Sequence, residues 1–240
     1  MQSVGNTFAY MFEKIKMKKT IMAIILAATG LSFCVQRQSA SANNTPEKKE
    51  KEVNMTDSAT LATATFGTGC FWCTEAVFQQ LKGVVKVTSG YSGGHVDRPT
   101  YKQVCTGTTG HAECLNIVYD TTVISFDELL EVFWQTHDPT TLNRQGNDVG
   151  TQYRSVIFYH NDEQKQKAEH YKAELDKSGA FGNPIVTTLE PFTTFFPAED
   201  YHQNYYNDNK DSNPYCSIVI RPKLEKFEKV FKNKLKKHAE

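Results

Sequence analysis

From Ala62 onward, short apolar runs alternate with amphipathic stretches, and this alternation restricts the fold more than any other feature. The runs indicate strands at Ala62–Phe66, Val84–Ser89, Cys114–Tyr119, Ser155–Tyr159 and Ile185–Leu189, and helices at Phe71–Lys82, Phe126–Thr136, Asp162–Lys177 and Ala198–Tyr205. The first four strands give the order strand–helix–strand, long loop, strand–helix–strand. That order predicts an α+β protein with a ferredoxin-like, split βαβ core, in which helices cover a mixed sheet.

Capping signals fix several boundaries of these helices. Ser125 and Glu128 have the spacing of a capping box, while Asn161 and Gly179 bracket the third helix. A basic helix is expected from about Leu224 as a C-terminal extension. Its buried stripe would consist of Phe227, Val230 and Phe231. Its solvated face would carry the lysines, namely Lys223, Lys226, Lys229, Lys232, Lys234, Lys236 and Lys237.

The first 61 residues differ in kind from the rest. Lysines precede an apolar run at Ile21–Phe33, and Ala40–Ala42 offers a small-residue cleavage site, so residues 1–42 are expected to be a signal peptide. Cys34 leaves a lipoprotein-type export segment as the alternative. Residues 43–61 are polar and predict a flexible linker, and residues 62–240 the catalytic domain. We therefore expect an exported chain, periplasmic or membrane-anchored facing the periplasm.

Composition excludes some classes of protein. Twenty-seven basic and 27 acidic residues give a net charge of zero, which argues against a nucleic-acid partner. Six cysteines in 240 residues are too few for a disulfide-stapled mini-domain and suit a thiol enzyme.

The stretch Thr65–Glu75 places a cysteine at a helix start. Two glycines end the strand, and Cys70 follows where unpaired N–H groups and the helix dipole favour a thiolate. Phe71 and Trp72 provide an apolar wall beside the sulfur, and Cys73 is a second thiol at C-x-x-C spacing. Cys70 is the expected nucleophile.

Two long loops, Gly90–Gly110 and Asp138–Tyr153, are rich in hydrogen-bonding side chains and indicate functional segments. Tyr101 and Tyr153 could direct two phenols at one oxygen, and Asp148 could orient a substrate or a water.

Glu113 lies at the entrance to an apolar strand, where partial burial would raise its pKa and make it a proton donor. His111 and Glu113 also have the H-x-E spacing of zinc deaminases, but the C-x-x-C comes before them, so we expect no metal. As the cysteine that forms a disulfide with Cys70, we place Cys216 ahead of Cys73, because Cys216 lies on a late loop that is able to move. Cys105 and Cys114 are expected to be packing residues.

Several separated motifs resemble the A-type peptide methionine sulfoxide reductases: Gly69–Cys73, Gly90–Gly94, Gly110–Glu113, and Gly146–Asp148 running into Gly150–Ser155. The resemblance covers roughly residues 62–222. It implies reduction of methionine S-sulfoxide, free or in proteins, to methionine, and hence repair of oxidised proteins.

The resemblance also implies roles for residues. Cys70 would attack the sulfoxide and become a sulfenic acid, Glu113 would protonate the sulfoxide oxygen, and Tyr101 and Tyr153 would hydrogen-bond to it. Asp148 would help to build the site. Phe71 and Trp72 would bind the substrate methyl group, and we add His111 to the substrate-binding residues. Many family members have glycine where this chain has Cys73, which leaves Cys216 and Cys73 both open as partners.

No cofactor is implied beyond an external dithiol reductant of the thioredoxin type. We take the chain to be a monomer that contacts a membrane only through an N-terminal lipid anchor, if Cys34 carries one. The alternative enzyme is a general C-x-x-C thiol–disulfide oxidoreductase using Cys70 and Cys73. A non-enzymatic alternative is a secreted binding module with a structural metal at the cysteines.

Overall fold

The computed structural model of the chain describes residues 60–236. The predicted export segment, nearly all of the predicted linker and the last lysine of the predicted basic face lie outside the described residues. Within them, no helix has the length and apolar character needed to cross a bilayer. The domain starts close to the expected position, because its first strand begins at Leu61.

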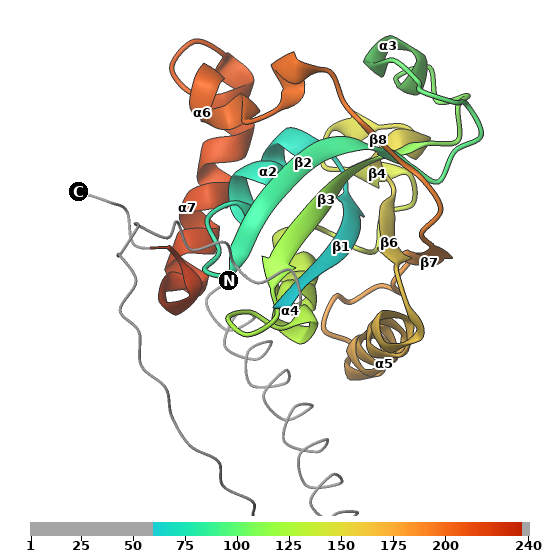
Figure 1. Cartoon of the computed structure of the whole chain (residues 1–240), viewed down its shortest axis with the longest axis vertical. Helices are drawn as coiled ribbons and strands as arrows, with labels where there is room; N and C mark the ends of the chain where they lie inside the picture. The colour runs from blue at the N-terminus through green and yellow to red at the C-terminus, as the bar shows by residue number, and fades with distance from the viewer. Residues whose placement is uncertain (1–59, 237–240) are drawn as a thin grey trace, which may run out of the picture. The chain divides into compact units, whose positions relative to one another are not determined.

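A six-stranded mixed sheet forms the centre of the domain, in the order β7-β6-β1-β3-β2-β8 (Figure 1). Its strands are β1 (Leu61–Thr68), β2 (Val84–Ser92), β3 (Ala112–Asp120), β6 (Ser155–Tyr159), β7 (Thr188–Pro191) and β8 (Phe195–Pro197). All neighbours are antiparallel except β6 and β7. The inner four strands, with one helix after β1 and another after β3, confirm the split βαβ prediction.

Helices α2 (Phe71–Phe78), α4 (Phe126–Thr136) and α5 (Asp162–Ser178) supply the main packing against the sheet. The ring of Phe66 on β1 lies 5.8 Å from that of Phe78 and 5.1 Å from that of Phe133, so one sheet residue joins α2 to α4. The expected capping box is present at Ser125, and α5 lies beside α4, where Lys167 pairs with Asp127 at 2.7 Å.

A smaller hydrophobic cluster consists of Ala112, Cys114, Val156 and Phe158, which alternate along β3 and β6 with residues of the main core. Phe192 and Phe195 pack against this cluster. Successive strand residues point to opposite faces, so this cluster covers the side of the sheet away from Ile157 and its neighbours. Cys114 is a packing residue, as predicted. Cys105 is not, because it is exposed in the short helix α3 region (Tyr101–Val104).

The segment after β8 differs from the prediction of a helix at Ala198–Tyr205. It forms a 3-10 turn at Asp200–His202, and α6 (Tyr205–Asn209) begins only afterwards. The break occurs at Asn204, which has a φ of 52° and donates its N–H to the buried Glu75 carboxylate on α2 at 2.8 Å. A long-range hydrogen bond therefore overrides the local helical pattern.

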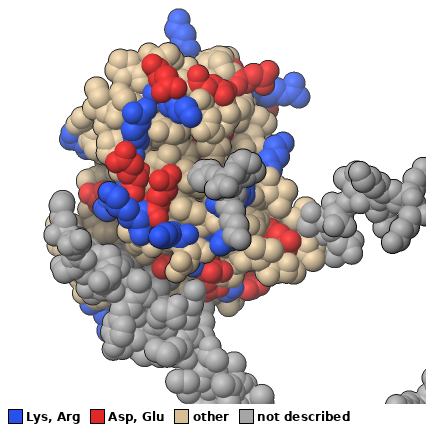
Figure 2. Space-filling view, turned by 90° about the vertical axis from the view of Figure 1, so that its left-hand side faces the viewer, with Lys and Arg blue, Asp and Glu red and all other residues tan. Residues whose placement is uncertain are grey.

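The C-terminal helix α7 (Arg221–Val230) follows a π-helical turn at Cys216–Ile220 and so begins before Leu224. Its buried side is Leu224, Phe227 and the following Phe231, whereas Val230 is 45% exposed, which makes its predicted burial wrong. Lys234 is not simply solvated, because it pairs with Glu128 on α4 at 2.8 Å. Figure 2 shows acidic and basic side chains interspersed on the face it presents, so the visible lysines form no single continuous patch there.

Other boundaries differ by a few residues, and β1, β2 and β3 are each longer than predicted. α2 ends at Phe78 rather than Lys82, α5 extends to Ser178, and the fifth predicted strand is displaced to Thr188–Pro191. These shifts leave the topology unchanged.

Candidate active site

The β1–α2 junction places both expected cysteines on the first turn of α2. Gly69 has a φ of +93°, and a Cβ there would lie 2.5 Å from the side chain of Gln145, so only glycine fits. Cys70 then takes the N-cap position, and Cys73 is the third helical residue. Both thiols are buried, and both are free.

Glu113 on β3 lies at the same helix start. Its carboxyl accepts the N–H of Phe71 at 3.0 Å and is only 1% exposed. Burial raises the pKa of Glu113 to about 8, with a smaller contribution from the charge of Asp148, although the Phe71 N–H opposes the shift. The carboxyl therefore holds its proton at neutral pH, as the sequence predicted.

Aromatic rings surround the expected substrate position. Phe71 stacks on Tyr101 with ring centroids 6.3 Å apart, and it lies 5.1 Å from His202. Trp72 stacks on Tyr205 at 3.8 Å and donates its ring N–H to Nδ1 of His202 at 3.1 Å. These contacts fix the two rings that the sequence assigned to the apolar wall.

The two loop tyrosines approach the buried carboxyl from different segments. Tyr101 begins α3, and Tyr153 ends a 3-10 turn at Thr151–Tyr153. Burial, followed by the negative charge of Glu113, raises the pKa of both phenols, so both keep their protons. Two neutral O–H donors close to one carboxyl can stabilise a developing negative oxygen.

On the other side of the first turn, Asp148 and Tyr215 meet beside Cys73. Asp148 lies on β5 (Asp148–Val149), which pairs with β4 (Arg144–Gln145) in a small hairpin. The Tyr215 hydroxyl donates to Oδ2 of Asp148 at 3.0 Å and lies 4.0 Å from Sγ of Cys73. Nζ of Lys223 on α7 lies 3.8 Å from the same sulfur.

A hydrogen bond between the two thiols shifts their pKa values in opposite directions. The hydrogen bond from Cys70 lowers the pKa of Cys73 to about 7, assisted by the charge of Lys223 and by Tyr215, although burial opposes it. The same hydrogen bond, followed by burial, raises the pKa of Cys70. This differs from the expectation of a thiolate at Cys70, because the cation that contacts the pair, Lys223, faces Cys73.

Cys216, which we placed first as the partner of Cys70, lies in a different setting from the one predicted. It begins the π-helical turn rather than lying on a loop, and it is completely buried. The predicted loop placement of Cys216 was therefore wrong, whereas Cys73 is hydrogen-bonded to Cys70.

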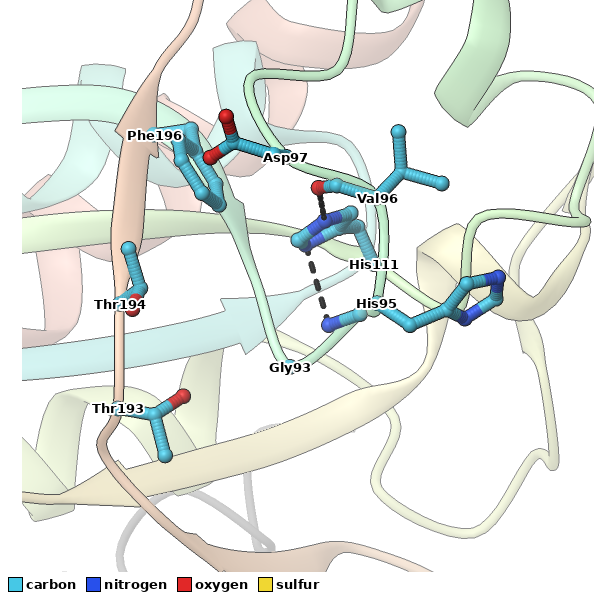
Figure 3. A pocket seen from close by; sticks show the side chains of 9 residues that line it. Gly93, His95, Val96, Asp97, His111, Thr193, Thr194 and Phe196 are labelled. Carbon is cyan, nitrogen blue, oxygen red and sulfur yellow. Dashed lines mark hydrogen bonds between the residues drawn. The ribbon is translucent and has the colours of Figure 1, made fainter.

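His111 has other partners than a substrate. Its Nδ1 accepts the N–H of Gly94 at 3.1 Å, its Nε2 bonds to the Val96 carbonyl at 2.8 Å, and its ring packs on Phe196. His111 lines a pocket of about 180 Å³. Figure 3 shows its ring beside Val96 of this loop. Both ring nitrogens are used to hold the loop, so we do not carry His111 into the proposed site.

Sequence reasoning missed His202, Tyr205, Tyr215 and Lys223. The cluster of tyrosines and histidine at residues 201–206 was a usable signal, because such rings are uncommon on a solvated helix. Within the described residues, no group of three or more Cys, His, Asp or Glu side chains is arranged to hold a metal ion.

Comparisons with known proteins point to one family. A family model described as peptide methionine sulfoxide reductase matches residues 62–235. Proteins named Peptide methionine sulfoxide reductase MsrA from Saccharolobus solfataricus and Acinetobacter baumannii (strain AYE) are each 58% identical to this chain, over 73% and 72% of its length and 97% and 98% of theirs.

Solved structures give the same result. The reduced form of Mxr1 from Saccharomyces cerevisiae matches with a TM-score of 0.61 at 38% identity, covering 65% of this chain and 90% of that chain. Methionine sulfoxide reductase A of Corynebacterium diphtheriae matches with a TM-score of 0.58 at 37% identity, covering 66% and 80%.

Proposed function

We propose that Cys70 is the nucleophile of this chain, which belongs to the peptide methionine sulfoxide reductase family and reduces methionine sulfoxide. The observation that carries the assignment is the contact of the Cys70 helix start with Glu113, whose carboxyl accepts the Phe71 N–H at 3.0 Å. A nucleophile and a protonated acid then lie at one helix terminus.

In the first step, Glu113 gives its proton to the sulfoxide oxygen, and the sulfur of Cys70 attacks the sulfoxide sulfur. The S–O bond of the substrate breaks, methionine leaves, and the hydroxyl remains on Cys70 as a sulfenic acid. Cys70 is oxidised by two electrons, and the substrate sulfur is reduced by two. Protonation is essential because an unprotonated sulfoxide oxygen is a poor leaving group.

Cys73 serves two purposes in this proposal. In the resting pair Cys73 is a thiolate, and it accepts the Cys70 proton during the attack. Cys70 can therefore act as the nucleophile although its own pKa is raised. Cys73 then attacks the sulfenic sulfur, forming a Cys70–Cys73 disulfide while the hydroxyl leaves as water. A dithiol reductant of the thioredoxin type reopens the disulfide.

Phe71 and Trp72 would hold the apolar end of the substrate, while Tyr101 and Tyr153 would hydrogen-bond to its oxygen. The stacked contacts of Trp72 with Tyr205 and of Phe71 with Tyr101 support a rigid wall. Asp148 would orient Tyr215 beside Cys73 by accepting the hydrogen bond of the Tyr215 hydroxyl.

Substitution of the nucleophile tests the assignment. The Cys70→Ser variant is expected to release no methionine from a methionine sulfoxide peptide, whereas Cys105→Ser, a change at an exposed thiol, should retain activity. Methionine release by Cys70→Ser would contradict the proposal. An insulin-reduction assay separates the general disulfide oxidoreductase, which would require Cys73 and Cys70 equally and no Glu113.

We further propose that the protein acts as an exported monomer on oxidised proteins outside the cytoplasm, facing the periplasm. The lysine-flanked apolar run and the small-residue site in residues 1–42 support this. Cell fractionation of the full chain tests it, with Cys34→Ala separating lipid anchoring from simple cleavage. A chain of unchanged mass in the cytoplasmic fraction would overturn the export proposal.

A further inference from the structure

Lys223 is the one lysine of α7 that approaches the cysteine pair. Its Nζ lies 3.8 Å from Sγ of Cys73, and the residue is half-buried. In the described part of the chain, no carboxylate lies within ion-pair distance of this amine. Other partly buried lysines do have such partners: Lys167 contacts Asp127 and Lys234 contacts Glu128. The sulfur is therefore the charged partner available to Lys223.

The fold sets this contact through the C-terminal segment. A π-helical turn at Cys216–Ile220 leads into α7, and π-helical turns are frequent at functional sites. Leu224 and Phe227 bury one side of α7, which fixes the rotation of the helix. Lys223 comes directly before the first of these anchors, so its side chain is directed to the border between the buried and exposed faces.

Apart from Lys223, the groups described around Cys73 are neutral or negatively charged. Cys70 donates a hydrogen bond to Cys73, and the neutral hydroxyl of Tyr215 donates a hydrogen bond to Asp148. The charge of Asp148 acts against ionisation of Cys73, Glu113 is protonated, and Cys216 is a further neutral thiol nearby. Lys223 supplies the positive charge that favours the thiolate, and it does so from 3.8 Å.

We propose that Lys223 is a positioning residue that holds Cys73 as a thiolate, and thereby speeds formation of the Cys70–Cys73 disulfide. The inference rests on the proposed role of Cys73. The Cys73 thiolate attacks the sulfenic sulfur, the S–S bond forms, and the S–O bond breaks. Cys73 first gives up the proton that it accepted from Cys70, and the leaving hydroxyl takes that proton and departs as water. Lys223 keeps its own protons throughout.

The test compares Lys223→Met with Lys223→Arg and with Lys226→Met, an exposed lysine of the same helix. Each reduced protein is mixed with one equivalent of a methionine sulfoxide peptide between pH 5.5 and 9. Methionine release reports the first step. Peptide mapping reports the disulfide, and a 1,3-dione reagent traps any remaining sulfenic acid.

For Lys223→Met we expect one equivalent of methionine, released more slowly at pH 7 because the Cys73 thiolate also accepts the Cys70 proton, and disulfide formation about tenfold slower, with sulfenic acid trapped before the disulfide forms. The loss should disappear at high pH, because the thiol then ionises without the lysine, which corresponds to a shift of roughly one pH unit. Lys223→Arg should restore the rate, and Lys226→Met should match the parent protein.

An unchanged pH profile of disulfide formation in Lys223→Met would overturn the inference. So would a slow rate that high pH or Lys223→Arg does not restore, since a purely structural defect behaves in that way. Failure of the proposed function has a different signature, namely no methionine from the parent protein or a disulfide that excludes Cys73. If Lys223→Met does not fold, Lys223→Gln with pH-dependent alkylation of Cys73 supplies the same comparison.

Discussion

The two flanks of the first turn of α2 have opposite effects on the pKa of their main acidic group. In the acid flank, formed by Glu113, Tyr101 and Tyr153, the carboxyl is buried and the two phenols are partly buried, and all three groups have raised pKa values. In the thiolate flank, formed by Asp148, Tyr215 and Lys223 around Cys73, the hydrogen bond from Cys70 and the charge of Lys223 lower the pKa of Cys73 to about 7, although burial and the charge of Asp148 oppose the shift. One helical turn thus keeps an acid protonated and a thiol ionised at the same pH, which the proposed reaction requires.

The largest effect on this contrast is expected from Glu113→Gln. The amide cannot give a proton to the sulfoxide oxygen, so the single-turnover rate of methionine release should fall by ~10²–10⁴-fold, the usual contribution of a positioned acid. Glu163→Gln, at a solvent-exposed position of α5, is the matched control. A rate within threefold, roughly, of the parent protein would remove Glu113 from the mechanism.

The pH dependence of the same first step tests both flanks together. The rate should rise through about pH 7 as the cysteine pair loses a proton, and fall through about pH 8 as Glu113 loses its own. On each limb the rate should change by about tenfold per pH unit. In Glu113→Gln the falling limb should be absent. A parent rate that still rises at pH 9 would show that no protonated acid is needed.

A smaller effect tests the C-terminal segment that carries the thiolate flank. Lys234 contacts Glu128 at 2.8 Å and Glu131 at 3.3 Å, so Lys234→Met should reduce the free energy of unfolding by about 1 kcal/mol at pH 7. Urea unfolding measures this, with exposed Lys232→Met as the control. Equal losses of unfolding free energy in the two variants would show that the ion pairs of Lys234 make no specific contribution to stability.

The pH dependence of that stability difference has a definite sign. Burial alone would raise the pKa of Glu128, but hydrogen bonds from Lys234 and Ser125 lower it to about 2. A depressed carboxyl pKa contributes stability above the unfolded value of about 4.3 and loses it as pH falls toward about 2. The difference between Lys234→Met and the parent protein should therefore shrink over that range.

The acid flank was largely predictable from sequence, because short-range patterns determine it. A strand followed by glycines and a helix fixes the place of Cys70, and an apolar strand after Glu113 ensures its burial. The capping box at Ser125 was likewise correct to the residue, since its hydrogen bonds are local.

The thiolate flank was not predictable, because it is assembled by tertiary contacts. Helical periodicity put Lys223 on a solvated face, since periodicity does not reveal which border of α7 meets α2. The break at Asn204 depends on Glu75, which is far away in sequence. Cys216 appeared to be on a mobile loop because Pro214 interrupts the pattern, whereas the chain there begins a π-helical turn.

The most direct test of the whole account is a map of the disulfide formed after one turnover of the parent protein without reductant. We predict a Cys70–Cys73 linkage in nearly all molecules that have released methionine, with Cys216 still a free thiol. A Cys70–Cys216 linkage formed at the rate of turnover would contradict the account, because it would bypass the thiolate that Lys223, Tyr215 and Asp148 surround.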